Sequence, residues 1–564
     1  VLISFYGRGQ YVRSFNFPDM TGGLGLAPTQ NGGFVGTGQH NGGSGGSCDS
    51  YVYKLNTCGE LLWYRTYGTA GSDGGRTVRE SLDGGLLVSG LFDSDGGNDY
   101  DYFIQKLDAS GNQLWLTVWN NGASNLGDYA HWVAETASQV FVSGSTNGSP
   151  WAGWNAVISS YNPLGVHMWT KAFGGGGEDN FCSIHAVSNG VIAGGITASY
   201  GSGGRDLFVA KTDFSGNVDW MNAYGTAGNE GGYWDTEGIP TNDGGYLMTG
   251  STNTAGLTGG GMDILLIKLD SLGVVEWAKT YGGPNNDWSE GLVVSPSGGY
   301  AIVGTSESYT NGGRDAVLLK VDSLGGFEWA NSYGQTGCDR GVDVINKEGG
   351  YVLSMNYNNS LAGCGINNEY DPMFIKTDSL GSCGCSFINA PYVSMDETTS
   401  IITTVINPAT ATEVITPNLQ ISSPPIIQGT PNITQNTICT VCSNVTPQWG
   451  YNDTIGCHGD TLKFYNTTAS SVGCFYWDNS ISYSSNGDTI LFVLDSTLGL
   501  TQDVALISVC GNNIDTLKQR VTVSHPIANY SIGNSCLIDT TIFVDNSTLN
   551  IENINRWEWS FGDG

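Results

Sequence analysis

The sequence predicts an all-β protein: a seven-bladed β-propeller followed by a linker and small β-sandwich modules. Three observations support this prediction. A ten-residue phrase recurs seven times at intervals of 51 to 57 residues. Within each repeat the apolar residues alternate with polar ones, a pattern typical of strands. Glycine accounts for 84 of the 564 residues, roughly twice its usual share, which suits short strands joined by tight turns.

The recurring phrase has the form Lys-x-Asp-x-x-Gly-x-x-x-Trp, and each repeat contains four short strands and no helical stretch. Four-stranded units that repeat at such a period are typical of propeller blades. We expect the tryptophans to pack between neighbouring blades, because burial of a large ring contributes on the order of a few kcal/mol; sugar stacking is the alternative. Six copies of the phrase end at a tryptophan: Trp63, Trp115, Trp169, Trp220, Trp277 and Trp329.

The two ends of the repeat region predict how the ring closes. The seventh copy, KTDSLGSCGC, has Cys385 in place of the tryptophan, whereas the chain opens with LISFYG, which aligns with WAKTYG at Trp277–Gly282. We therefore predict that residues 2–6 supply the outer strand of the seventh blade and pair with Met373–Thr377. Such a swap removes the exposed edges of an open array. The propeller would then occupy residues 1–386.

The remaining chain divides into three segments. Residues 387–446 contain no Lys or Arg and are rich in Thr, Ile, Pro and Asn, which predicts an extended linker, either free or with strands laid against a neighbour. CHGDTLKFYN at Cys457–Asn466 matches CLIDTTIFVDN at Cys536–Asn546 in the spacing of Cys, Asp-Thr and Phe. Alternating strands follow, so residues 447–526 are predicted to form a β-sandwich and residues 527–564 the start of a second, truncated one.

Two of these motifs resemble known families. The DGGY…KLDSLG…W…TYG pattern resembles the propeller repeats of large secreted proteins of Bacteroidota-type bacteria, and RWEWSFGDG at Arg556–Gly564 resembles the Ig-like PKD module. Residues 447–526 are similar to a more diverged copy of that module. The resemblance implies an extracellular protein, released or held at the cell surface, with type IX secretion machinery as a partner. We also expect the chain to be part of a longer, processed polypeptide.

The charge excludes several classes of partner. Acidic residues exceed basic ones by 31, so nucleic acid, whose binding depends on Lys and Arg neutralising phosphates, is not an expected partner. An anionic membrane surface is disfavoured for the same reason, and no apolar run reaches the ~18–20 residues that cross a bilayer, so no membrane insertion is expected. The 13 cysteines favour an oxidising, extracellular location.

An acidic residue follows the Tyr-Gly region that ends each repeat, at the start of the innermost strand of the next blade: Asp73, Asp128, Asp179, Glu230, Asp287 and Asp339. Aromatic residues lie beside this acid in successive blades. Ring faces for stacking and carboxylates for hydroxyl groups suit a polyol ligand at the channel mouth. Packing between blades and capping of turns form the alternative interpretation. The predicted ligand-binding residues are Tyr129, Trp234, Asp235, Asp287, Trp288 and Glu290.

Catalysis and a resident cofactor find little support in the sequence. The six histidines are scattered, and no Ser-His-Asp or phosphate-loop motif is present. The acids of the Gly-Gly-x-Asp loops are open to two interpretations: calcium binding, because carboxylates suit this ion, and turn capping by acceptance of backbone N–H bonds. No metal site is assigned. These loop acids are Asp99, Asp206, Asp263 and Asp315.

Cysteine positions predict two disulfides. Cys338 and Cys364 lie in loops at the same end of the seventh blade, and Cys457 and Cys510 lie in an early and a late strand of the first sandwich. Cys536 is expected to pair beyond Gly564. An Asp followed by Ser or Thr resembles the O-glycosylation signal of exported Bacteroidota proteins, with turn chemistry as the alternative. The glycosylation candidates are Thr454, Thr461, Thr489, Thr516 and Thr540.

Together these features predict a non-enzymatic, secreted surface protein. Its propeller would present a face that binds a glycan, a surface protein or further copies of itself, on a stalk of Ig-like modules. Two alternatives stay open: a structural subunit of a surface layer or filament, and a carbohydrate-active enzyme that uses carboxylates of the channel. A propeller fold by itself does not distinguish these functions.

Overall fold

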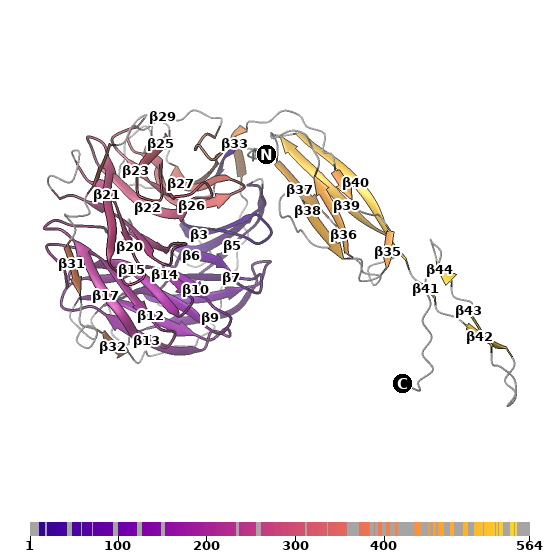
Figure 1. Cartoon of the computed structure of the whole chain (residues 1–564), viewed down its shortest axis with the longest axis horizontal. Helices are drawn as coiled ribbons and strands as arrows, with labels where there is room; N and C mark the ends of the chain where they lie inside the picture. Colours follow the sequence, from indigo (N-terminus) through magenta and orange to yellow (C-terminus); the bar gives the residue numbers. More distant parts are fainter. Residues whose placement is uncertain are drawn as a thin grey trace. The chain divides into compact units, whose positions relative to one another are not determined.

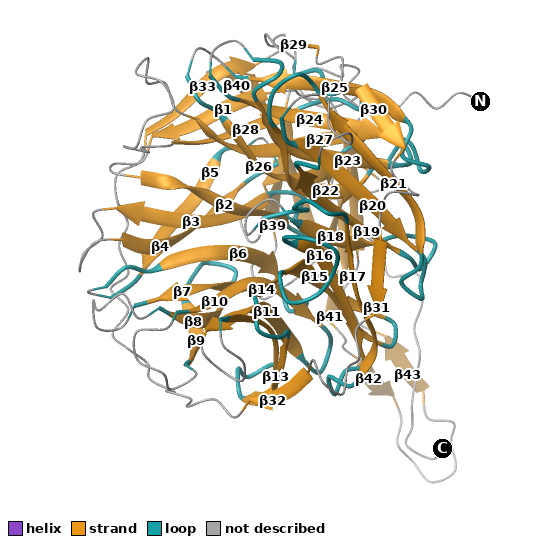
Figure 2. Cartoon of the chain, turned by 90° about the vertical axis from the view of Figure 1, so that its left-hand side faces the viewer, coloured by secondary structure: helices purple, strands orange, loops and turns teal. Residues whose placement is uncertain are grey.

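The chain folds into two units, residues 1–441 and 442–564 (Figure 1). The computed structural model describes residues 11–383 apart from 17–19, 42–47, 58, 70, 94–99, 121–126, 148–152, 233–235, 255–260, 311–312, 335–336 and 358–370, and beyond them only the strands. All described elements are strands joined by turns and loops (Figure 2). Within these ranges there is no helix long and apolar enough to span a bilayer.

The first unit contains seven four-stranded antiparallel blades, as the sequence predicts. In each blade the first strand is innermost, and the first strands of neighbouring blades contact one another around the ring. Blades 1 to 3 consist of β2 (Met20–Pro28), β3 (Phe34–Asn41), β4 (Cys48–Leu55) and β5 (Leu61–Tyr67); β6 (Gly74–Glu80), β7 (Leu86–Phe92), β8 (Asp101–Leu107) and β9 (Gln113–Trp119); and β10 (Asp128–Glu135), β11 (Val140–Asn147), β12 (Trp154–Tyr161) and β13 (His167–Phe173).

The other four blades follow in chain order, and the last takes its fourth strand from the N-terminal part of the chain. They consist of β14 (Asp179–Val187), β15 (Gly190–Thr197), β16 (Asp206–Thr212) and β17 (Val218–Gly225); β18 (Glu237–Pro240), β19 (Tyr246–Thr252), β20 (Asp263–Leu269) and β21 (Val275–Gly282); β22 (Asp287–Val294), β23 (Tyr300–Ser306), β24 (Asp315–Val321) and β25 (Phe327–Tyr333); and β26 (Arg340–Lys347), β27 (Gly350–Tyr357), β28 (Asp371–Lys376) and β1 (Tyr11–Asn16).

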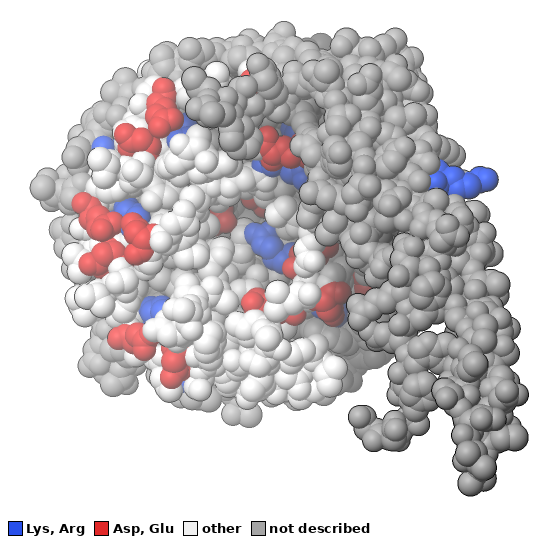
Figure 3. Space-filling view, turned by 45° about the vertical axis from the view of Figure 1, so that its right-hand side comes forward, with Lys and Arg blue, Asp and Glu red and all other residues white. Residues whose placement is uncertain are grey.

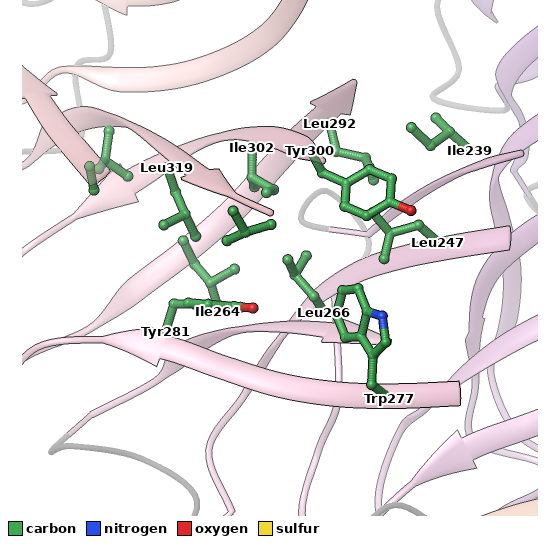
Figure 4. Packing of buried hydrophobic residues seen from close by; sticks show 13 residues of the cluster. Ile239, Leu247, Ile264, Leu266, Trp277, Tyr281, Leu292, Tyr300, Ile302 and Leu319 are labelled. Carbon is green, nitrogen blue, oxygen red and sulfur yellow. The ribbon is translucent and has the colours of Figure 1, made fainter. Parts of the chain in front are cut away.

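Hydrophobic cores lie between blades rather than within single sheets. One cluster joins Leu247 and Leu266 of blade 5 to Ile302 and Leu319 of blade 6, and all four side chains are fully buried (Figure 4). Comparable clusters join blades 1 and 2, 2 and 3, 3 and 4, 4 and 5, and 6 and 7. Because alternate residues of a strand face opposite sides of its sheet, blades 2 to 6 are each packed on both faces by their neighbours.

A repeated contact fastens each outer strand to the next blade. In the turn between β20 and β21, Gly273 adopts a φ of +78°, and a Cβ at this position would approach the Trp220 ring of the preceding blade to 2.8 Å. The Tyr224 hydroxyl donates to the Gly273 carbonyl at 2.6 Å. Only glycine combines this φ with such close approach. The predicted packing of the tryptophans between blades is thus confirmed, and the same glycine contact occurs for Trp63, Trp115, Trp169, Trp277 and Trp329.

The ring closes through an N-terminal strand, but not through the predicted residues. Tyr11–Ser14 of β1, rather than residues 2–6, pair antiparallel with Met373–Lys376 of β28. Phe15 contacts Phe374 edge-on, with ring centroids 5.6 Å apart. Residues 2–6 lie outside the described part of the chain. Val12 and Phe15 are buried in the core.

Five short strands after the seventh blade extend the blades outward. The segment predicted as a linker contains β29 (Ile388–Asn389), β30 (Val393–Asp396), β31 (Ile402–Val405), β32 (Thr412–Ile415) and β33 (Thr434–Thr440). The first four pair in turn with the outer strands of blades 6, 5, 4 and 3, and β33 pairs with β1. The segment therefore follows the alternative in which its strands are laid against a neighbour, and we call these five strands the belt.

The second unit contains a three-stranded and a four-stranded sheet, followed by two pairs of short strands. Their strands are β34 (Trp449–Tyr451), β36 (Thr461–Asn466) and β38 (Thr489–Val493); β35 (Ile455–Cys457), β40 (Asn513–Ser524), β39 (Thr501–Cys510) and β37 (Cys474–Asp478); β41 (Pro526–Ile527) and β44 (Thr548–Leu549); and β42 (Tyr530–Gly533) and β43 (Ile542–Asp545). The structure does not describe the side chains of the glycosylation candidates, nor Cys536. These candidates are Thr454, Thr461, Thr489, Thr516 and Thr540.

The predicted Cys457–Cys510 disulfide is wrong for this arrangement of strands. Cys457 pairs with Ser524 at one end of β40, whereas Cys510 pairs with Asn513 at the other end. Eleven residues of extended strand separate these partners, roughly 36 Å. A disulfide requires Cα atoms within about 7 Å of each other, so these two cysteines cannot be joined.

We predict that Gly273→Ala destabilises the propeller more than Gly244→Ala. Both glycines lie in turns of blade 5 with φ values of +78° and +83°, so alanine meets the same backbone strain in both. A Cβ at position 273 meets Trp220 at 2.8 Å, whereas at position 244 it meets no atom within 4 Å. We expect an additional loss of about 1–3 kcal/mol in the free energy of unfolding, measured by urea denaturation. Equal losses would contradict the role assigned to the contact.

Cys338 forms a disulfide in the structure. Its predicted partner, Cys364, lies outside the described residues, so the Cys338–Cys364 pairing stays a prediction. Peptide mapping of the non-reduced protein is expected to recover the two cysteines in one cross-linked fragment. Loss of the bond in Cys338→Ser should lower the free energy of unfolding by roughly 2–4 kcal/mol. A fragment that joins Cys338 to any other cysteine would disprove the assignment.

Candidate functional site

The acids at the blade junctions are buried and hold loops. Asp287 is fully buried, and its carboxylate accepts hydrogen bonds from the Gly283 amide at 2.8 Å and the Ser308 hydroxyl at 2.7 Å. The same contact to the amide four residues earlier occurs at other junctions. Burial and the two hydrogen bonds to Oδ2 favour the turn-capping interpretation of Asp287, in the loop between blades 5 and 6.

The aromatic residues of the predicted site are engaged by neighbouring side chains. The guanidinium carbon of Arg314 lies 4.9 Å from the Trp288 ring centroid, and the Trp288 Nε1 lies 3.3 Å from Met262 Sδ. Tyr129 packs against Trp154 with centroids 5.0 Å apart. Both rings are only partly exposed. The structure therefore does not gather Tyr129 and Trp288 into one open platform, and Trp234 and Asp235 lie outside the described residues.

A second buried carboxyl faces the junction acid. Between blades 4 and 5, Asp206 and Glu230 both approach Gly225: a Cβ there would lie 1.5 Å from Asp206 Oδ1 and 2.6 Å from Glu230 Oε2. Ser202 donates its amide to Asp206 Oδ2, and Glu230 accepts from the hydroxyls of its threonine neighbours. Burial, followed by the proximity of Glu230, raises the pKa of Asp206 from 3.8 to about 7. Burial beside Glu230 therefore favours the protonated form of Asp206.

The central channel contains the other charged cluster of the propeller. The inner strands of six blades carry a bulge, and in five of them the bulge turns one side chain toward the channel. Each of these residues is the third after the junction acid, and each lines a central cavity of about 100 Å³. The bulge residues are Arg76, His131, Cys182, Glu290 and Val342. Of the residues predicted for the ligand site, Glu290 lies here.

The cavity wall is a charged network. Arg340 donates to both carboxylate oxygens of Glu290, at 2.7 and 2.8 Å. Asp343 accepts from the Leu26 amide at 3.0 Å, and Glu237 accepts from the Leu292 amide at 2.9 Å. Basic and acidic side chains lie together in the central hollow of the ring (Figure 3).

Burial sets the protonation of this network. Burial, and then the charge of Asp343, raises the pKa of Glu237 well above its usual range. Burial also raises the pKa of Asp343, against the opposing charge of Arg79. Burial, and then the charge of Arg76, lowers the pKa of His131 to about 3, so His131 is neutral at pH 7. For Arg76 itself, burial lowers the pKa to about 9, and the nearby Arg340 contributes to this shift.

A different surface exposes apolar residues. The turns between the first and second strands and those that follow the third strand of each blade lie at one end of the ring, because the strands alternate in direction. We call these turns and the first residues of the outer strands the hairpin face. Ten of the eleven exposed large apolar residues among the described residues lie there: Leu62, Leu82, Leu114, Leu164, Val166, Met168, Leu272, Val274, Leu324 and Leu380.

The sequence prediction misses most of the residues that line the cavity. It is based on the junction acids, whereas the cavity is lined by the residues three positions after them. The junction acid is regular and easily aligned, whereas the residue three positions later varies from blade to blade. That variation is itself a signal, since a position that serves only the repeated fold would be expected to keep one residue type. The hairpin face was also missed, although the Leu of Asp-Ser-Leu-Gly stands in three copies of the phrase.

The calcium interpretation receives no support within the described ranges, where no group of three or more His, Cys, Asp or Glu residues is arranged to hold a metal. Asp206 caps its own loop through Ser202. Asp99 lies outside the described residues. The pairs at the blade junctions supply two carboxyls each, fewer oxygen ligands than the six to eight that calcium takes.

Comparisons with known proteins identify no family for the chain. No protein-family model matches it. The regulatory protein FlaEY of Caulobacter vibrioides is 22% identical over 392 residues, which cover 62% of this chain and 40% of that protein. The match thus spans about two fifths of the relative's length.

Two solved structures are similar to parts of the chain. A fungal alcohol oxidase of the AA5 family, in complex with copper, aligns with 92% of this chain and 99% of its own at 12% identity and a TM-score of 0.35. Sqt1 from Chaetomium thermophilum aligns with 63% of this chain and 86% of its own at 12% identity and a TM-score of 0.30. TM-scores this low carry no argument about the site.

The Asp206–Glu230 pair predicts a pH dependence of stability. Because folding raises the pKa of Asp206, the folded state binds the proton more tightly, and this contribution is largest below pH ~4 and is lost as the pH rises toward 7. Asp206→Asn should therefore be more stable than the wild type at pH 8, with the difference shrinking toward pH 4. Asn155 at the equivalent position of blade 3 shows that the fold accepts the amide.

The thermal unfolding midpoint measured from pH 4 to 8 checks this prediction. Asp219→Asn serves as the control, because the Asp219 side chain is exposed and pairs with Lys211. Parallel pH profiles for the wild type and Asp206→Asn would show that folding does not raise the pKa of Asp206.

Proposed function

We propose that this protein is a secreted, non-enzymatic binding protein that docks a protein partner on the hairpin face of its propeller. The observation that carries the proposal is the concentration of exposed aliphatic side chains there. Leu164, Leu272, Leu324 and Leu380 are 68–76% exposed at equivalent turns of four blades. Apolar residues exposed together on one face of a protein indicate an interaction site, whereas single ones spread over the whole surface are ordinary.

The chemistry of this face favours a protein over a glycan. Sugars stack on aromatic rings, whereas the most exposed apolar side chains of the hairpin face are leucine, valine and methionine. The two described aromatics of the predicted glycan site, Tyr129 and Trp288, have rings that contact their neighbours. Carboxylates such as Asp270 and Asp322 stand in the same turns as the leucines. A partner with an apolar centre and a basic rim would complement this surface.

The proposed export route, cellular location and glycosylation are based on the sequence resemblance. Export by type IX secretion machinery, an extracellular location and O-glycosylation fit the secreted proteins that the repeats resemble. The disulfide at Cys338 supports an oxidising compartment. The two sheets of the second unit support a stalk of Ig-like modules that would space the propeller from the cell.

Site-specific photo-crosslinking tests the docking face. A benzoylphenylalanine at position 272 should crosslink a discrete protein of the producing cell, whereas one at Asn285, exposed in a loop at the other end of blade 5, should not. The double variant Leu272→Asp, Leu324→Asp should weaken binding of that protein by about tenfold or more. Its thermal stability should be unchanged, because both side chains are 70% exposed.

Two results would redirect the assignment. Crosslinks between copies of the chain would favour the filament or surface-layer subunit instead. Glycan-array binding that survives the double leucine variant but is lost in Trp288→Ala would place recognition at the other face and refute the proposal.

A further inference from the structure

A bulge in the outer strand of blades 1 to 6 sets one residue apart from the strand ladder. In blade 5, Lys268 pairs with Trp277 and Leu269 pairs with Val275, so Glu276 is the extra residue of the bulge. The equivalent residue precedes the tryptophan of the repeated phrase in each of these blades, and it is exposed in all six. We call these the outer-bulge residues: Leu62, Leu114, Met168, Asp219, Glu276 and Glu328.

The chemistry of the outer-bulge residue divides the hairpin face into two halves. The residue is leucine or methionine in blades 1 to 3, and aspartate or glutamate in blades 4 to 6. A bulge directs its extra side chain away from the paired strands, so the packing of the sheet does not decide what stands there. The change from apolar to acidic residues therefore indicates a partner that contacts the two halves differently.

In the acidic half, the positive charges lie beneath the negative ones. The ammonium groups of Lys211, Lys268 and Lys320 bond the outer-bulge carboxylates of their own blades at 3.1, 2.7 and 3.1 Å. These lysine side chains are at most 10% exposed, whereas the acids are 44–46% exposed. In blade 5, Asp243 also bonds Lys268, at 2.8 Å, so two carboxylates share one ammonium group. An incoming molecule therefore meets carboxylates rather than lysines.

The fold does not need an acid at the outer-bulge position. In blade 2 this residue is Leu114, and the buried Lys106 pairs instead with Asp83 of a nearby turn, at 2.8 Å. In blade 3 the lysine itself is replaced by Ser160, and the outer-bulge residue is Met168. Because the lysine finds another acid or is absent, its pairing does not account for the acids of blades 4 to 6.

The two halves meet between blades 3 and 4. Leu164 and Met168 of blade 3 are 76% and 51% exposed. Gln139 connects this apolar group to the next blade, because its Nε2 lies 3.8 Å from Met168 Sδ and donates to the Phe214 carbonyl at 3.3 Å. Phe214 stands in the turn that precedes Asp219. A single partner surface can therefore cover apolar side chains on blade 3 and reach a carboxylate on blade 4.

We propose that the hairpin face binds a cationic, amphipathic segment of its protein partner. The apolar side of the segment covers the outer-bulge residues of blades 1 to 3, and its Lys or Arg side chains pair with the outer-bulge acids of blades 4 to 6. Lys and Arg suit this boundary, since their aliphatic stems cover apolar surface while their charged groups reach an acid. The inference rests on the proposed function, which assigns the hairpin face to a protein partner.

The test uses three synthetic peptides of equal length and one amphipathic helical pattern. They are built from leucine and lysine, from leucine and glutamate, and from serine and lysine. Binding to the full chain is measured by fluorescence anisotropy, and we expect the leucine–lysine peptide to bind at least about tenfold more tightly than the other two. Equal binding of the leucine–glutamate peptide would show that charge has no role, and equal binding of the serine–lysine peptide would show non-specific attraction. Either result would overturn the proposal.

Variants locate the binding on the two halves. Glu276→Gln combined with Glu328→Gln should weaken binding of the leucine–lysine peptide by roughly threefold to tenfold, since two exposed ion pairs are lost. Glu178→Gln should leave it unchanged, because Glu178 is exposed in the loop between β13 and β14, at the other end of the ring. Leu114→Ser combined with Met168→Ser should also weaken binding, and it leaves the lysine–acid pairs intact. This second variant keeps the test decisive if the glutamine variant fails to fold.

Unchanged affinity in either double variant, with an unchanged thermal midpoint, would refute the assignment. The outcome is distinct from that of the docking proposal. A partner that crosslinks at position 272 but binds the double glutamine variant as tightly as the wild type would overturn the cationic segment and leave the docking face standing.

Discussion

The ring depends on one contact between consecutive blades: a tryptophan of the outer strand lies under a glycine in the next blade's turn. The glycine must adopt a left-handed φ and must lack a side chain, since the indole occupies that space. A tyrosine hydroxyl from the same outer strand reaches the carbonyl of that glycine in four blades. Aromatic packing and a directional hydrogen bond thus fix the position of each blade relative to its neighbour.

This contact explains why so much of the fold could be predicted from sequence. The phrase Lys-x-Asp-x-x-Gly-x-x-x-Trp contains both residues that make this contact, the turn glycine and the tryptophan. Because each blade has one copy of the phrase, the number of copies gives the number of blades. The prediction that an N-terminal strand closes the ring is confirmed, but the predicted residues are wrong. Leu2–Tyr6 and Tyr11–Asn16 are both short alternating segments near the N-terminus. Which segment pairs depends on the distant strands β28 and β33, and the local sequence pattern does not reveal that.

The candidate site was harder to predict because its chemistry departs from the repeat. Regular positions such as Asp287 and Asp206 serve the loops of the fold, whereas the irregular bulge positions, Arg76 and Glu290 among them, reach the channel. A bulge has no reliable sequence signature, since it depends on how two strands pair. The individual strands of the belt could not be predicted from the sequence for a similar reason. They are two to seven residues long and pair with strands far away in the chain.

The belt and the closing strand also determine the order in which the propeller can assemble. β1 forms near the start of the chain, but its two partners are β28 and β33, the latter ending at Thr440. During synthesis, the strands of blades 1 to 6 can therefore pair with near neighbours in the chain. β1 can pair with β28 only after more than 350 further residues have been made. The contacts that close the ring join residues far apart in the chain. Because such contacts form slowly, closure of the ring is expected to limit the folding rate of the first unit.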